Sequence, residues 1–331
     1  MASATSAAST STREIQAELS GFIRVYKDGT VERFFGSPIV PPSASDPQTG
    51  VSSKDVVISD DPSISVRLYL PKPTQSSSRR KLPIFVYFHG GGFCLVSAFS
   101  FLNHRYVNLI ASEANVIAVS VEYRLAPEHP LPAAFEDCWA SLKWVSSHST
   151  NSPTNAGDPW LTNHGDFTRL YIGGDSAGGT IVHNMALRCG AENLPGDVKL
   201  LGGFLSCPYF WGSKPIGSEA EQGHEQSWPA LLWRLAYPSA PGGMDDPTIN
   251  PTAEGAPSLG NLECSKLLVC VCEEDELRDR GVLYYEAVKR SGWEGKMDFL
   301  EVEGEGHCFH ISNIDTENAK KILNRLFCFL T

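Results

Sequence analysis

The sequence predicts an α/β fold in which a mostly parallel sheet is covered by helices. Six short apolar runs, rich in β-branched and aromatic residues, are typical of strands buried on both faces, and they cover residues 83–88, 116–121, 170–172, 200–205, 267–272 and 297–302. Segments with helical periodicity lie between and after these runs, at residues 133–147, 177–189, 281–291 and 317–330. Strands that alternate with helices favour parallel pairing, with the helices on the faces of the sheet.

Two segments depart from this alternation. Residues 14–45 hold a short amphipathic stretch and then two apolar runs separated by Asp28-Gly29, a pair that is typical of turns. Residues 208–262 are rich in Trp, Pro and Gly and contain no long apolar strand pattern. We therefore expect a single domain over residues 14–331, with a lid that is formed by these two segments.

Length and charge exclude several classes of function. The 331 residues fit one core better than two independent domains, because single cores stop growing at roughly 250–300 residues. The net charge of −11 repels nucleic-acid phosphates and anionic lipid headgroups. No apolar run approaches the ~18 residues that a membrane span needs. The protein is thus predicted to bind a small-molecule substrate, and neither nucleic acid nor a membrane.

The cysteines and the N-terminal segment indicate a cytoplasmic protein. The nine cysteines are odd in number and scattered along the chain, which favours reduced thiols. Residues 1–13 are rich in Ser, Ala and Thr and lack the apolar core of a secretory signal, so we expect a disordered tail there. The histidines and cysteines do not have the spacing of a metal site, and no phosphate-binding glycine motif is complete. We predict neither a metal nor a cofactor.

A strand-to-helix turn carries the candidate nucleophile. Gly174, Ser176 and Gly178 form the pattern Gly-x-Ser-x-Gly directly after an apolar run and before a helical segment. A serine at such a turn projects its hydroxyl outward, and the flanking glycines allow the backbone to turn sharply. The N-terminus of the following helix also favours negative charge on the nucleophile. The pattern alone is common, and its position between strand and helix makes Ser176 the predicted nucleophile.

A run of glycines after another strand predicts an oxyanion hole. Backbone N–H groups approach a substrate oxygen closely only where side chains are absent, and each such donor is typically worth about 3 kcal/mol of transition-state stabilisation. The predicted donors are the N–H groups of Gly90, Gly91, Gly92 and Ala177.

A base and the carboxylate that orients it are expected after two later strands. When the serine lies at a turn of this kind, the order along the chain is Ser, then Asp or Glu, then His. Asp275 and His307 each follow an apolar run, at the edge where parallel sheets form their active sites. Asp275 would hold the imidazole in the correct tautomer, and His307 would accept the Ser176 proton.

Each of these two residues has a rival nearby. His310 lies between Phe309 and Ile311, in apolar surroundings, and is interpreted as structural. Asp279 is interpreted as a cap of the following helix or as a partner of Arg280. Asp275 is favoured over Asp279 because it lies nearer to the end of the strand.

Four motifs occur in one order within residues 15–330. They are His89-Gly90-Gly91-Gly92, Tyr123-Arg124-Leu125-Ala126-Pro127-Glu128, Gly174-Asp175-Ser176-Ala177-Gly178 and Asp275-Glu276-Leu277-Arg278-Asp279. Together they resemble the hormone-sensitive-lipase-like plant carboxylesterases. This resemblance implies an α/β-hydrolase fold with an eight-stranded sheet and a helical lid, and an activity without a cofactor.

Three further segments, at 211–219, 223–225 and 238–243, resemble a subgroup of that family, the 2-hydroxyisoflavanone dehydratases of legumes. Those dehydratases typically carry Thr at the nucleophile, followed by Ser-Gly-Ala, and one Ala in the glycine run. This sequence has Ser176 followed by Ala-Gly-Gly, and its glycine run is complete. An unhindered serine hydroxyl can attack an ester carbonyl, whereas the methyl group of Thr crowds that attack.

The motifs and the resemblance predict a carboxylesterase that cleaves small esters, including aromatic or flavonoid-type esters, through an acyl-enzyme. A 2-hydroxyisoflavanone dehydratase, with or without esterase activity, is the alternative. A non-catalytic receptor is disfavoured, because the gibberellin receptors that resemble this family replace the histidine that His307 provides here. Three aromatic residues are predicted to contact the substrate, although the lid aromatics are equally compatible with a role in the lid core; these are Phe93, Phe210 and Trp211.

Overall fold

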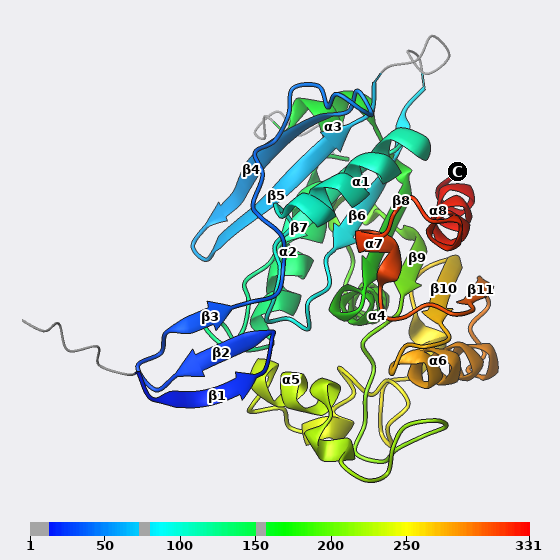
Figure 1. Cartoon of the computed structure of the whole chain (residues 1–331). Helices are drawn as coiled ribbons and strands as arrows, with labels where there is room; N and C mark the ends of the chain where they lie inside the picture. Colours follow the sequence, from blue (N-terminus) through cyan, green and yellow to red (C-terminus); the bar gives the residue numbers. More distant parts are fainter. Residues whose placement is uncertain (1–12, 73–79, 150–156) are drawn as a thin grey trace, which may run out of the picture.

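The computed structural model describes residues 13–72, 80–149 and 157–331, and its central element is a sheet of eight strands (Figure 1). The strands lie in the order β11-β10-β9-β8-β6-β7-β5-β4. In chain order they are β4 (Ser52–Asp60), β5 (Ser63–Leu70), β6 (Leu82–Phe88), β7 (Ile117–Glu122), β8 (Gly165–Asp175), β9 (Leu200–Ser206), β10 (Lys266–Cys272) and β11 (Lys296–Val302). Only β5 pairs antiparallel, with β4 and β7. The predicted mostly parallel sheet is confirmed.

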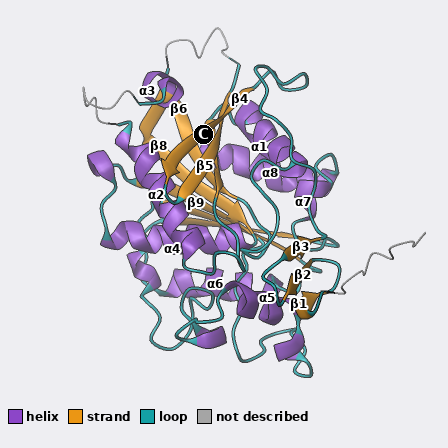
Figure 2. Ribbon diagram, turned by 90° about the vertical axis from the view of Figure 1, so that its left-hand side faces the viewer, coloured by secondary structure: helices purple, strands orange, loops and turns teal. Residues whose placement is uncertain are grey.

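The sheet separates two hydrophobic cores, because side chains along a strand point alternately to opposite faces. On β6, Ile84 and Val86 enter one core, whereas Phe85 and Tyr87 enter the other. The helices of the first core are α2 (Ala133–Ser147), α3 (Pro159–His164), α4 (Ala177–Ala191) and α6 (Arg278–Arg290). Those of the second are α1 (Phe101–Glu113), α7 (Phe309–Ser312) and α8 (Glu317–Leu330). Figure 2 shows the sheet between α2 and α4 on one side and α1 and α8 on the other.

The N-terminal segment contributes strands, where the sequence suggested part of a helical lid. A separate antiparallel sheet is formed by β1 (Ile15–Leu19), β2 (Ile23–Tyr26) and β3 (Val31–Arg33). The expected turn joins β2 to β3: the Tyr26 N–H donates to the Thr30 carbonyl at 2.9 Å, and Gly29 has a φ of 85°. Glycine adopts this positive φ without steric cost, so the turn closes the hairpin.

The second segment that departs from the alternation, 208–262, is described throughout and contains one α-helix, α5 (Trp228–Ala236). Short 3₁₀ turns complete it, at η2 (His224–Gln226), η3 (Gly243–Asp245) and η4 (Leu259–Asn261). Helix α5 contacts β1, and the two lie beside each other below the large sheet in Figure 1. The two segments predicted to form the lid are therefore neighbours in space.

Element boundaries agree best where the apolar pattern is strong. The helices expected at 133–147 and 317–330 coincide with α2 and α8. Strand β8 begins at Gly165, well before its apolar run, because its polar first half pairs with the start of β6 at Leu82. No helix of the described ranges is long and apolar enough to cross a membrane. The predicted tail lies outside the described residues, except for Arg13.

Candidate active site

The predicted site residues follow the C-terminal ends of several parallel strands. The glycine run follows β6, Ser176 follows β8, Asp275 lies in the loop after β10, and His307 lies after β11. Because parallel strands present their carboxyl ends at one edge, this topology brings four distant segments together. The site is thus positioned by the sheet, which is the most deeply buried part of the molecule.

Ser176 lies on a sharp turn between β8 and α4. Its φ of 55° and ψ of −120° are strained for a residue with a side chain. The turn packs so tightly that a Cβ on Gly174 would lie 2.5 Å from the Gly178 backbone, and one on Gly178 would lie 1.9 Å from the Phe88 carbonyl oxygen. The Ser176 N–H donates to the Ser206 carbonyl at 2.9 Å. The two glycines are required here by close backbone approach.

Three predicted residues form a continuous hydrogen-bonded chain. His307 Nε2 lies 2.9 Å from Ser176 Oγ, and His307 Nδ1 lies 2.8 Å from Asp275 Oδ2. The other carboxylate oxygen of Asp275 accepts from the Leu277 N–H at 3.0 Å. With its Nδ1–H donated to Asp275, the imidazole presents the Nε2 lone pair to the serine hydroxyl. The arrangement can therefore accept a proton from Ser176.

The Asp275 carboxylate dominates the electrostatics of this chain. Burial lowers the pKa of His307, but the adjacent negative charge of Asp275 and its hydrogen bond outweigh burial and raise the pKa to about 9. Burial raises the pKa of Asp275 itself, against the lowering effect of His307. The Asp275 side chain is 1% exposed and that of His307 is 28% exposed, so solvent reaches the histidine but not the aspartate.

The glycine run lies directly against the nucleophile. A Cβ on Gly90 would lie 3.0 Å from the Asp175 carbonyl oxygen and 3.2 Å from Ser176 Cβ. Gly91 and Gly92 have positive φ values of 98° and 58°, which a side chain would make costly. Across the turn, Ala177 is the first residue of α4, where backbone N–H groups have no helical acceptor. The predicted donors therefore surround the serine hydroxyl.

The lid contacts this loop and the histidine. A Cβ on Gly92 would lie 1.9 Å from Leu232 Cδ2 of α5, so the helix rests on the glycine run. The Trp228 ring centroid lies 5.6 Å from that of His307, and the indole is half-buried. Trp228 belongs to the lid aromatics of the sequence, but its place beside the histidine had no signal in the pattern.

The three aromatic residues predicted to contact substrate are buried. Phe93 packs 5.6 Å from Phe135, and Phe210 packs 4.8 Å from Tyr284. Trp211 stacks on His224, with ring centroids 4.7 Å apart. These contacts match the alternative that the sequence left open, a role in the core beneath the lid. Direct contact of the three with substrate stays a prediction.

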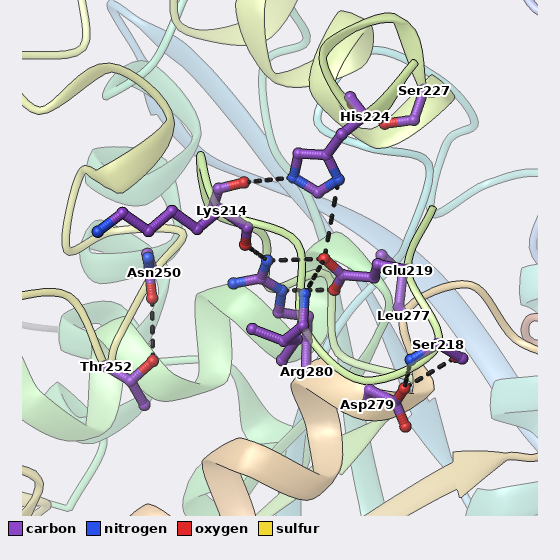
Figure 3. Close-up of polar contacts among 12 residues, drawn as sticks. Lys214, Ser218, Glu219, His224, Ser227, Asn250, Thr252, Leu277, Asp279 and Arg280 are labelled. Carbon is purple, nitrogen blue, oxygen red and sulfur yellow. Dashed lines mark hydrogen bonds and ion pairs between the residues drawn. The ribbon is translucent and has the colours of Figure 1, made fainter. Parts of the chain in front are cut away.

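The rival aspartate has other partners (Figure 3). Asp279 accepts from the Ser218 N–H at 2.6 Å and pairs with Arg278 at 2.6 Å. It does not pair with Arg280, as one interpretation had it, because Arg280 forms a buried ion pair with Glu219 at 2.6 Å. Figure 3 shows both contacts joining the lid to the start of α6. Asp279 thus anchors the lid, and Asp275 reaches His307.

The second histidine has a polar partner that the sequence did not suggest. His310 is fully buried, as its apolar neighbours indicate, yet its Nε2 lies 2.7 Å from Asp175 Oδ1. The Tyr87 hydroxyl donates to Asp175 Oδ2 at 2.7 Å. Asp175 immediately precedes Ser176, so this pair fixes the backbone behind the nucleophile.

The fold and site define the class of protein. Residues 85–311 match the family model described as alpha/beta hydrolase fold, and the chain belongs to this family. It is 60% identical to a 2-hydroxyisoflavanone dehydratase of Glycyrrhiza echinata, with all of both chains covered. It is 55% identical to the one of Glycine max, over 96% of this chain and 99% of the relative. The family and the resemblance predicted from the sequence are confirmed.

A solved structure gives the same fold. The hyperthermophilic esterase from the archaeon Pyrobaculum calidifontis superposes with a TM-score of 0.67 at 28% sequence identity, and the match covers 84% of each chain. The described fold is therefore an esterase-like α/β-hydrolase fold.

Proposed function

We propose that this chain is a carboxylesterase that uses Ser176 as nucleophile, His307 as general base and acid, and Asp275 as the group that orients His307. The observation that carries this proposal is the continuous chain of hydrogen bonds from Ser176 Oγ through His307 to Asp275, at 2.9 and 2.8 Å. A positioned nucleophile, a base within hydrogen-bond reach and an orienting third group are the requirements of covalent acyl transfer.

The reaction follows from this geometry in two halves. Ser176 Oγ attacks the ester carbonyl carbon while His307 Nε2 takes the hydroxyl proton, and the carbonyl oxygen becomes an oxyanion near the predicted N–H donors. Collapse of this intermediate breaks the ester C–O bond, and His307 returns the proton to the leaving alcohol. Water then attacks the acyl-enzyme with the same base, which releases the acid and restores Ser176.

The substrate class follows from the entrance to the site. Trp228 is half-buried beside His307, so an aromatic acyl or alcohol group can stack there without displacing the core. We propose small aromatic or flavonoid-type carboxylic esters, hydrolysed without metal or cofactor. All nine cysteines are free thiols, and we place the enzyme in the cytoplasm, where thiols stay reduced.

A second function, 2-hydroxyisoflavanone dehydration, is favoured by one observation, the 60% identity over the full length with a protein of that name. Elimination of water needs a base and an acid but no covalent intermediate. His307 can remove a proton from carbon, and a hydroxyl group at Ser176 can donate to the departing oxygen. In that reaction the serine is a donor and not a nucleophile.

Two substitutions at one position separate the two functions. Purified wild-type protein is assayed with short-chain p-nitrophenyl esters and with 2-hydroxyisoflavanone, beside Ser176→Ala and Ser176→Thr. For an esterase, Ser176→Ala lowers ester turnover by roughly 10⁴-fold or more, and Ser176→Thr also lowers it strongly. For a dehydratase, Ser176→Thr keeps the elimination. Full ester turnover in Ser176→Ala would rule out the covalent mechanism.

A further inference from the structure

Three cysteines from distant parts of the chain meet beside His307. Cys207 follows β9, Cys272 ends β10, and Cys308 follows His307 in sequence. The Sγ atoms of Cys207 and Cys272 lie 3.5 Å apart, and Cys308 Sγ lies 3.6 Å from His307 Nε2. Neither the esterase nor the dehydratase reaction uses a thiol at this position.

The spacing of the thiols and the imidazole matches that of ligands on one metal ion. The Cys207, His307 and Cys308 ligand atoms all lie within 4.8 Å of one another. Tetrahedral zinc binds thiolate sulfur at ~2.3 Å and imidazole nitrogen at ~2.0–2.1 Å, which places any two of its ligands about 3.5–3.8 Å apart. The 3.6 Å between Cys308 Sγ and His307 Nε2 already has this value.

His307 is also prepared as a ligand by its other nitrogen. Nδ1 is held by the Asp275 carboxylate at 2.8 Å, so the Nε2 lone pair points outward. Metal-binding histidines in proteins are oriented by the same carboxylate contact on the other ring nitrogen. The feature that makes His307 a base therefore also makes it a ligand for zinc.

The backbone aims both thiols at this point. Cys207 and Cys308 have positive φ values of 44° and 51°, which residues with a side chain rarely adopt. Such conformations persist where the surroundings fix them, and here both project a sulfur atom toward the same imidazole. Cys308 is half-buried and the His307 side chain is 28% exposed, so an ion can reach them from solvent.

We propose that Cys207, Cys308 and His307 form an inhibitory binding site for Zn²⁺, with the remaining coordination position open to water. Thiolate and imidazole are ligands that zinc prefers. Bound zinc occupies the Nε2 lone pair, so His307 can no longer take the proton of Ser176. Zinc binding itself does not depend on the reaction, whereas the inhibition rests on the proposed function.

Metal binding is tested first without any enzyme assay. Metal-free protein is titrated with Cd²⁺, which reports thiolate ligands through an ultraviolet charge-transfer band, and with Zn²⁺ by calorimetry. Wild type is expected to bind one ion tightly. Cys308→Ser and Cys207→Ser each weaken binding by roughly 100-fold or more, because even loss of an outer-shell partner costs about 10–100-fold.

The control is Cys328→Ser, which removes an exposed thiol on α8 and should leave binding unchanged. Cys308 is the safer variant for folding, since Cys207 is fully buried. No charge-transfer band in wild type, or an unchanged band in a folded Cys308→Ser variant, would overturn the site.

Ester turnover is then measured with increasing Zn²⁺. Inhibition should follow the same binding curve, should be reversed by a chelator, and should need roughly 100-fold more zinc in Cys308→Ser. Tight Cd²⁺ binding with no effect of Zn²⁺ on turnover would refute the role of His307 as ligand. If the protein shows no ester turnover at all, the spectroscopic titration still decides the site, so the two failures are distinguishable.

Discussion

Two histidine–aspartate pairs lie on opposite sides of the Ser176 turn. His307 meets Asp275 at 2.8 Å and His310 meets Asp175 at 2.7 Å, from histidines only three residues apart. The first histidine side chain is 28% exposed, whereas the second is 0% exposed. Identical chemistry is thus placed once where substrate and the serine hydroxyl can reach it, and once where neither can.

The difference lies in what the second nitrogen of each ring contacts. His307 Nε2 contacts Ser176 Oγ at 2.9 Å. The Nδ1 atom of His310 is buried without a hydrogen-bond partner in the described part of the chain. One pair can therefore move a proton, and the other can only hold the backbone at Asp175. We infer that access, and not the pairing itself, separates a catalytic histidine from a structural one.

The largest expected effect is on turnover when the same substitution is made in both pairs. His307→Gln should lower kcat for ester hydrolysis by roughly 10⁴–10⁶-fold, because the only base within reach of Ser176 is lost. His310→Gln, which keeps a donor toward Asp175, should lower kcat far less. Steady-state kinetics of both folded variants test this contrast, and equal losses would contradict the division of roles.

The contrast should reverse when stability is measured. His310→Leu leaves Asp175 buried with Tyr87 as its remaining side-chain partner, so unfolding free energy should fall by about 3–5 kcal/mol. His307→Leu removes a partly exposed ring and should cost clearly less. Denaturant unfolding monitored by circular dichroism gives both values. A larger loss for His307→Leu would show that the exposed pair, and not the buried one, supports the fold.

The pH dependence sharpens the same comparison. The pKa of His307 is raised to about 9, from an ordinary value of 6.5, so its base form and its activity should increase as the pH rises toward 9. The His307–Asp275 contact stabilises the fold below the unfolded pKa and loses this effect as the pH passes about 9. In Asp275→Asn the pKa should fall by roughly 1–3 units, since burial then acts without the opposing charge.

Histidine NMR titration measures this shift directly, because it does not need the activity that Asp275→Asn loses. Asp279→Asn serves as the control, since Asp279 bonds to Ser218 and Arg278 on the lid side of α6. An unchanged His307 pKa in Asp275→Asn would mean that another group sets the proton affinity.

The sequence was sufficient for the sheet and for the ends of its strands. Continuous apolar runs predict strands buried on both faces, and the carboxyl ends of parallel strands converge, so Ser176, Asp275 and His307 could be brought together without coordinates. Their roles in catalysis remain proposals, but their proximity was predictable from topology. The turn at Gly29 was predictable for the same reason, since it depends on residues adjacent in sequence.

Contacts between side chains far apart in sequence were not predictable. Asp175 and His310 are 135 residues apart, and their neighbours in sequence are apolar, so the pattern gave no sign of a buried pair. Cys207 and Cys272 are 65 residues apart, which hides a thiol cluster from any test of metal-site spacing. In both cases periodicity assigns a residue to a face of the sheet, but it does not identify which side chain lies opposite.

The smallest expected effect concerns one hydrogen bond behind the nucleophile. Tyr87→Phe removes the hydroxyl that donates to Asp175 Oδ2 at 2.7 Å and leaves the ring in the core formed with Tyr106. Loss of a buried hydrogen bond to a carboxylate should lower the unfolding free energy by about 1–3 kcal/mol. Tyr106→Phe is the matched control, because the Tyr106 hydroxyl is buried without a partner among the described residues. Since Tyr87 contacts neither Ser176 Oγ nor His307, KM should stay unchanged and kcat should fall only slightly; a loss of kcat as large as that of His307→Gln would mean that Asp175 acts in the reaction itself.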